Sequence, residues 1–79
     1  MTNLETFLTI YQEKLQDAVI QHPTEYAYAV SMVPLVVERM SKAIVNGTYH
    51  LSGPALKATC KALGIKMTYK AINTYLGVV

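Results

Sequence analysis

Apolar residues recur at steps of three and four over residues 2–21, a pattern that predicts an amphipathic helix near 3–21. Thr2 and Glu5 have the spacing of a capping box, in which each side chain bonds to the other residue's backbone N–H. His22 precedes Pro23, and a residue before proline is disfavoured in the helical region, so we expect the helix to end there.

Residues 26–40 are apolar at nearly every position, which indicates a segment in the middle of the fold. Pro34 lacks the N–H that a continuous helix needs, so we expect two helices, near 24–32 and 34–46. Thr24 is the expected N-cap of the first helix, and Gly47 supplies a left-handed residue that ends the second.

Residues 48–53 are expected to form a linker, with Ser52 as the N-cap of a helix near 53–62. Thr68 is the expected cap of a last helix near 67–76. The sequence therefore predicts one all-α domain over residues 1–79, a bundle of four to five helices. The residues expected to be mostly buried are Tyr11, Leu15, Val33, Val36, Val37, Met40, Leu56, Leu63, Ile65 and Ile72.

The chain is short and apolar, with 79 residues, 52% of them hydrophobic and 15% charged. A soluble domain of ordinary composition has about 25% charged residues. A bundle of this size has a shallow core, and large exposed apolar patches are rare on soluble monomers. We therefore expect a homo-oligomer, most simply a two-fold dimer.

We expect a protein of the cytoplasm. The most apolar window, residues 26–37, is shorter than the roughly 20 residues of a membrane-spanning helix. No basic segment precedes an apolar run near Met1, so no signal peptide is expected. Cys60 is the only cysteine, which excludes an internal disulfide and fits a reducing compartment.

Charge is unevenly distributed along the chain. Residues 1–38 contain five acids and one base, Lys14, for a charge of 1 − 5 = −4, whereas residues 39–79 contain six bases and no acid, for +6. This asymmetry indicates a polyanionic partner for the basic half, or a surface whose two halves attract each other.

The sequence lacks the parts of most catalytic sites. His22 and His50 have no cysteine or carboxylate at metal-ligand spacing, and no phosphate-binding glycine loop is present. Cys60 lies on an apolar helical face, where a buried thiol is the simpler interpretation. We therefore expect no enzyme, no cofactor and no metal.

The segment LGIKMTYKAINTYL, residues 63–76, has the features of a helix-turn-helix. Gly64 lies between two apolar residues that can hold the flanking helices together. Basic and small polar groups on the outer side suit phosphates and base edges. The candidate nucleic-acid-binding residues are Lys57, Lys61, Lys66, Lys70 and Asn73.

Two features depart from the common motif. Lys70 stands where the second helix should show a core residue, so the turn would be longer than usual, and the segment has no arginine, the commonest base reader. A plain αα-hairpin with exposed lysines explains the same residues.

The stretches ALKATCKALGIKMTYKAINTYL and FLTIYQEKLQDAVIQHPTEYAYAV resemble a group of short uncharacterised proteins of tailed bacteriophages. The resemblance implies a phage protein made in the bacterial cytoplasm and carries no site residues. Two functions fit: a small DNA-binding or regulatory protein that uses the basic helix pair on duplex DNA, or a non-enzymatic module that binds a host protein.

Overall fold

The first helix begins and ends where its capping residues predict. A computed structural model describes residues 2–78, and in it α1 spans Asn3–Gln21. The backbone N–H of Glu5 donates to Oγ1 of Thr2 at 3.1 Å, and the N–H of Thr2 donates to Oε1 of Glu5 at 3.3 Å. His22 follows the last turn, so the capping box and the His-Pro boundary are both confirmed.

The helix predicted near 24–32 is wrong. A turn follows Pro23, the chain then runs without regular structure, and only the short 3₁₀ helix η1 (Val30–Met32) forms before the next α-helix. Tyr26 and Tyr28 are partly buried, whereas the alanines that alternate with them are exposed. Alternation with a period of two is typical of an extended segment, and it overrides the apolar composition that favoured a helix here.

The other three helices lie close to their predicted positions. They are α2 (Val33–Asn46), α3 (Pro54–Leu63) and α4 (Tyr69–Leu76). The Oγ1 atom of Thr68 accepts the N–H of Ala71 at 3.1 Å, as predicted for a cap. Ser52 does not cap α3, because Gly53 occupies that position with φ +92° and no side-chain bond.

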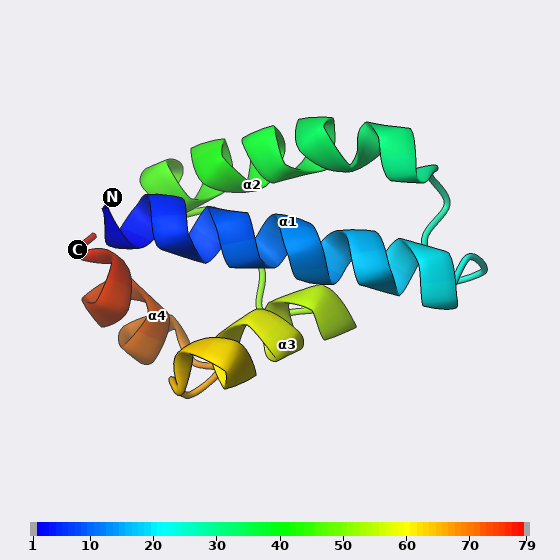
Figure 1. The fold of residues 1–79 in the computed structure, drawn as a ribbon. Helices are drawn as coiled ribbons and strands as arrows, with labels where there is room; N and C mark the ends of the chain where they lie inside the picture. The colour runs from blue at the N-terminus through cyan, green and yellow to red at the C-terminus, as the bar shows by residue number, and fades with distance from the viewer. Residues whose placement is uncertain (1, 79) are drawn as a thin grey trace.

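Helix α1 lies at the centre of the bundle (Figure 1). Helix α2 packs along one side of it, and α3 and α4 lie on the opposite side. The beginning of α1 and the end of α4 lie close together, where Nδ2 of Asn3 donates to the backbone carbonyl of Tyr75 at 2.8 Å. Residues 2–78 are either helical or irregular, and none of them forms a strand.

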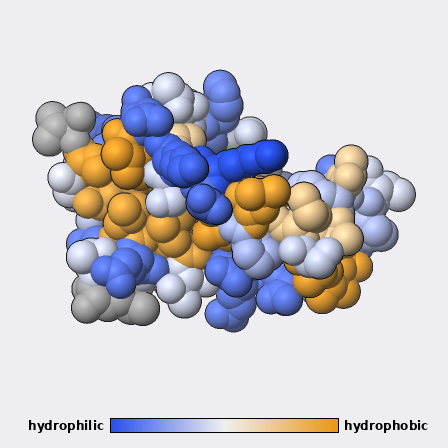
Figure 2. Space-filling view, turned by 90° about the horizontal axis from the view of Figure 1, so that it is seen from above, coloured by the Kyte–Doolittle hydropathy of each residue, from blue (hydrophilic) through white to orange (hydrophobic). Residues whose placement is uncertain are grey.

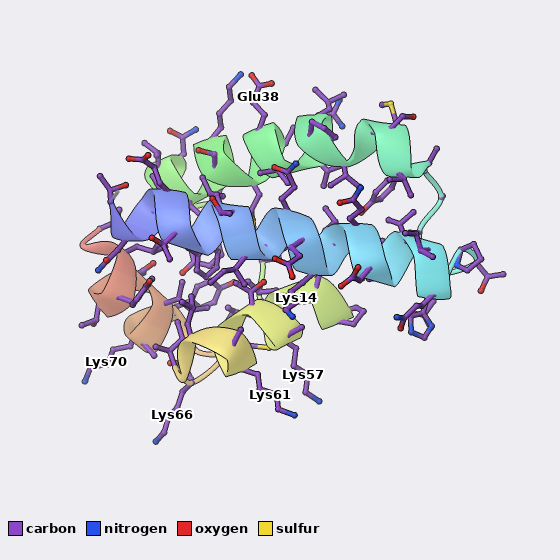
Figure 3. The ribbon with its side chains drawn as sticks, viewed as in Figure 1. Lys14, Glu38, Lys57, Lys61, Lys66 and Lys70 are labelled. Atoms are coloured by element: carbon purple, nitrogen blue, oxygen red, sulfur yellow. The ribbon has the colours of Figure 1, made fainter. Side chains whose placement is uncertain are left out.

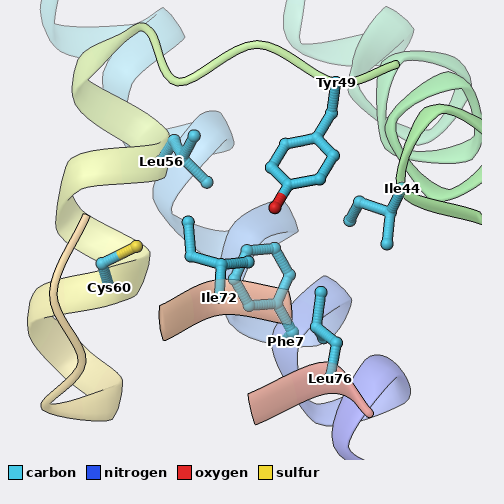
Figure 4. Close-up of a cluster of buried hydrophobic side chains, with 7 residues drawn as sticks. All are labelled: Phe7, Ile44, Tyr49, Leu56, Cys60, Ile72 and Leu76. Atoms are coloured by element: carbon cyan, nitrogen blue, oxygen red, sulfur yellow. The ribbon is translucent and has the colours of Figure 1, made fainter. Parts of the chain in front are cut away.

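One core cluster joins all four helices around Phe7, which is fully buried on α1 (Figure 4). Ile44 comes from α2, while α3 contributes Leu56 and Cys60. Two residues of α4 and one residue of the 47–53 connection complete the cluster: Ile72, Leu76 and Tyr49. This cluster holds α3 and α4 against α1 and so fixes where their outer faces point.

A second cluster lies toward the other end of α1, around Leu15, Val19, Val33 and Ala55. The tyrosines of the extended segment pack against it, so much of the apolar surplus of residues 26–40 is covered within one chain. Of the residues predicted to be mostly buried, four are buried and the others are half-buried. The four are Leu15, Val33, Leu56 and Ile72.

Candidate nucleic-acid interface

Four lysine side chains project from the side of α3 and α4 that faces away from α1 (Figure 3). Two belong to α3, one to the connection between the helices, and one to α4. All four residues are exposed. They are Lys57, Lys61, Lys66 and Lys70, hereafter the lysine face.

No Asp or Glu of residues 2–78 forms an ion pair with these lysines, and no acid follows Glu38 in the sequence, so the nearest acids in the packing are those of α1. The ion pairs found among residues 2–78 lie elsewhere: Lys42 pairs with Glu38 at 3.4 Å on α2, and His22 lies 3.9 Å from Glu25. Glu38 projects from the side of the molecule opposite to the lysine face (Figure 3). The four ammonium groups are therefore free to meet an external anion.

The connection between α3 and α4 is longer than the common motif allows, as the position of Lys70 predicted. It spans residues 64–68 and begins at Gly64 with φ +69°. The N–H of Ile65 donates to the carbonyl of Cys60 at 3.0 Å, and that of Gly64 to the carbonyl of Lys61 at 3.2 Å. These two bonds form a Schellman motif, which terminates α3 and sets the direction of the chain toward Lys66.

Asn73, the fifth predicted binding residue, is engaged inside the protein. The hydroxyl of Tyr49 donates to its Oδ1 at 2.6 Å, and the Asn73 side chain is half-buried. Tyr69, the first residue of α4, is 47% exposed. Its hydroxyl donates to the backbone carbonyl of Tyr49 at 3.2 Å, and the two rings meet edge to face with centroids 5.2 Å apart.

Tyr49 itself was not predicted as a core residue. It lies in the segment expected to be a linker, yet only 5% of it is exposed. A single buried aromatic residue in a loop produces no periodic pattern of apolar positions from which its burial could be predicted. The one available signal was its size, because an aromatic ring buries a large apolar area.

A shallow groove of about 290 Å³ lies between α1, α2 and the 47–53 connection. Its lining combines apolar side chains, among them Tyr11, Val36 and Met40, with Arg39 and His50. The lining contains no acid, and Arg39 contributes a positive charge to it. It is separate from the lysine face, whose residues do not line it.

The described residues hold no metal-binding group of three or more His, Cys, Asp or Glu side chains. Burial raises the pKa of the Cys60 thiol, which keeps it protonated and poorly nucleophilic. Burial, with smaller effects of Tyr28 and Tyr26, raises the pKa of Tyr11 to about 12. Burial likewise raises the pKa of Tyr28 and Tyr49, so these phenols stay neutral and can serve as hydrogen-bond donors.

Comparison with protein-family models, curated proteins and solved structures finds no match. The similarity to phage proteins therefore stays a prediction. Within residues 2–78, none of the helices combines the length and the apolar character of a membrane span.

Proposed function

We propose that the protein is a small DNA-binding or regulatory protein that contacts duplex DNA through the lysine face. The observation that carries the proposal is the common direction of four exposed lysines on α3, the connection and α4, none of which forms an ion pair within residues 2–78. Cations in this arrangement neutralise phosphates and release the counterions condensed on DNA, which favours binding. In this proposal α3 and α4, which pack mainly on α1 and little on each other, present their lysines together as the two helices of a helix-turn-helix with an extended turn would.

The proposal is tested by fluorescence anisotropy with a labelled 20-base-pair duplex. If the four lysines each neutralise one phosphate, the slope of log K against log salt is about −0.9 × 4 = −3.6, so affinity falls about 150-fold between 50 and 200 mM salt. Replacing the lysine face by glutamine should remove binding at 50 mM salt, while thermal unfolding changes little because all four residues are exposed.

A matched control keeps the test specific to this surface. Lys42→Gln with Arg39→Gln removes two positive charges from α2, and it should weaken binding far less than Lys66→Gln with Lys70→Gln, which removes two from the lysine face. Equal losses from both pairs would show that net charge alone attracts DNA. An absence of duplex binding at low salt would exclude the proposed function.

An alternative function, a module that binds a host protein or a second copy of itself, is favoured by a different surface. Met32, Leu35 and Val45 are exposed to 42%, 39% and 65%, and all lie at the start of α2 or on it. Figure 2, seen from the α2 side, shows apolar side chains gathered over the half of the molecule that holds the end of α2, to which Val45 belongs, whereas Met32 and Leu35 lie at the other end of that helix. A partner captured from bacterial lysate that survives nuclease treatment would favour this function over DNA binding.

A further inference from the structure

Sequence-specific reading of DNA requires side chains that form paired hydrogen bonds with base edges. Arginine on guanine and asparagine or glutamine on adenine are the common pairs, and acids accept from cytosine. Residues 54–76, which contain α3, the connection and α4, include no Arg, Gln, Asp or Glu. Asn73 is therefore the only side chain other than lysine that could make a bidentate contact there.

The structure commits Asn73 to a different contact. Its Oδ1 accepts the hydroxyl of Tyr49 at 2.6 Å, and Tyr49 is held in the core cluster with 5% exposure. A bidentate contact with adenine uses both the oxygen and the nitrogen of the amide. The Tyr49 bond takes one lone pair of Oδ1 and fixes the orientation of the half-buried amide, so a bidentate contact would be possible only if adenine approached in that one orientation.

The three threonine hydroxyl groups of residues 54–76 are also engaged. Thr59 is fully buried and donates to the carbonyl of Ala55 at 2.7 Å, and Thr74 donates to the carbonyl of Lys70 at 2.7 Å. Oγ1 of Thr68 accepts the N–H of Ala71. A threonine hydroxyl that keeps some bonding capacity contacts different bases equally well and so discriminates little between them.

The exposed ring of Tyr69 is fixed in the same way. Its hydroxyl donates to the backbone carbonyl of Tyr49, and its ring rests edge to face on the Tyr49 ring. The exposed groups of this segment with no hydrogen bond or ion pair inside the protein include the four lysines of the lysine face. Lysine is a compact, flexible point charge, which suits phosphates better than the fixed geometry of a base edge.

We propose that the lysine face reads the phosphate backbone of duplex DNA and not its base sequence. This proposal rests on the DNA-binding function proposed above and narrows its ligand to duplex DNA of any sequence. The positive charges are distributed over α3, the connection and α4 and are not concentrated on one recognition helix. Lysines distributed in this way can contact successive phosphates along the DNA backbone. Each such contact fixes the position of the protein on the duplex but does not depend on the base sequence.

The test compares unrelated labelled duplexes of equal length and a duplex pool with a randomised centre, all at 50 mM salt. We expect dissociation constants within about three-fold of one another, and no consensus after repeated selection from the pool, because phosphate contacts carry no sequence information. Asn73→Ala and Tyr49→Phe should each leave affinity within about two-fold, because neither residue is proposed to touch the DNA.

Each other outcome has a definite meaning. A duplex bound about 1,000-fold more tightly than the rest is typical of specific recognition and would overturn the inference while leaving the DNA-binding function intact. A loss of affinity in Asn73→Ala for one sequence alone would also overturn it, since it would show base reading by that amide. No binding to any duplex at low salt would overturn both the inference and the proposed function.

Discussion

Changing Tyr49 to Phe removes one hydroxyl and tests the contact that withdraws Asn73 from the binding face. The phenol donates to Oδ1 of Asn73 at 2.6 Å, and its ring packs in the core cluster with Phe7 and Leu56. Phenylalanine keeps the ring, so the variant opens no large cavity. The change therefore isolates the hydrogen bond.

The expected cost follows from the environment of the two groups. A hydrogen bond inside a protein contributes about 1 kcal/mol net, and a partner left unsatisfied raises the cost of its removal. Asn73 is half-buried, so water can replace part of the lost bond. We expect the free energy of unfolding to fall by about 1 kcal/mol, which lowers Tm by about 4–8 °C in a domain of this size.

The assay is thermal and urea unfolding followed by circular dichroism at 222 nm. Tyr69→Phe is the matched control, because its hydroxyl makes a longer bond of 3.2 Å from a ring that is 47% exposed; we expect a loss below about 0.5 kcal/mol. A double-mutant cycle of Tyr49→Phe with Asn73→Ala should give a coupling energy of at least about 0.5 kcal/mol. An unchanged Tm, or a coupling energy near zero, would refute the contact and with it the reason for excluding Asn73 from DNA.

Three further predictions concern stability and assembly. Gly64→Ala should lower the free energy of unfolding, measured in urea, by about 1 kcal/mol. An added Cβ would meet no neighbouring atom, so the cost comes only from the left-handed backbone conformation at φ +69°. An unchanged free energy of unfolding would refute that conformation. Raising the pH from about 10 to about 12 should lower the free energy of unfolding, because the pKa of Tyr11 is about 10 in the unfolded chain and is raised to about 12 in the folded protein. Tyr11→Phe should weaken this pH dependence. An equally steep loss of stability in the variant would contradict the assignment to Tyr11. Light scattering at micromolar concentration should give twice the 8.8 kDa of one chain, and Leu35→Glu with Val45→Glu should give single chains, whereas a mass of one chain for the unchanged protein would exclude the dimer.

The sequence predicted most of the helices because local signals agree with the tertiary structure. The capping box of Thr2 and Glu5, the cap at Thr68 and the stop at Gly47 each act within one turn of chain. Residues 24–32 differ because their composition is apolar whether they form a helix or an extended segment. Only the alternation of Tyr26 and Tyr28 with alanine distinguishes the two, and it is too short to outweigh composition.

The candidate site was predictable in charge but not in hydrogen bonding. Helical spacing places Lys57 and Lys61 on one face, and the structure adds Lys66 and Lys70 to the same side of the molecule. The bond between Tyr49 and Asn73 joins residues 24 positions apart in the chain. Such a pairing depends on how the 47–53 connection packs against α4, which no local pattern encodes.

The central claim is that the lysine face is the surface that meets duplex DNA, and mapping backbone amides by ¹⁵N–¹H NMR during titration with a short duplex tests it most directly. We predict that shift changes concentrate on residues 57–70, in α3, the connection and the start of α4, and that they diminish as salt is added. The amides of α2 around Glu38 and Lys42, on the opposite side, should change little. Shift changes that concentrate on α2, or a spectrum that does not respond to the duplex at low salt, would contradict the claim.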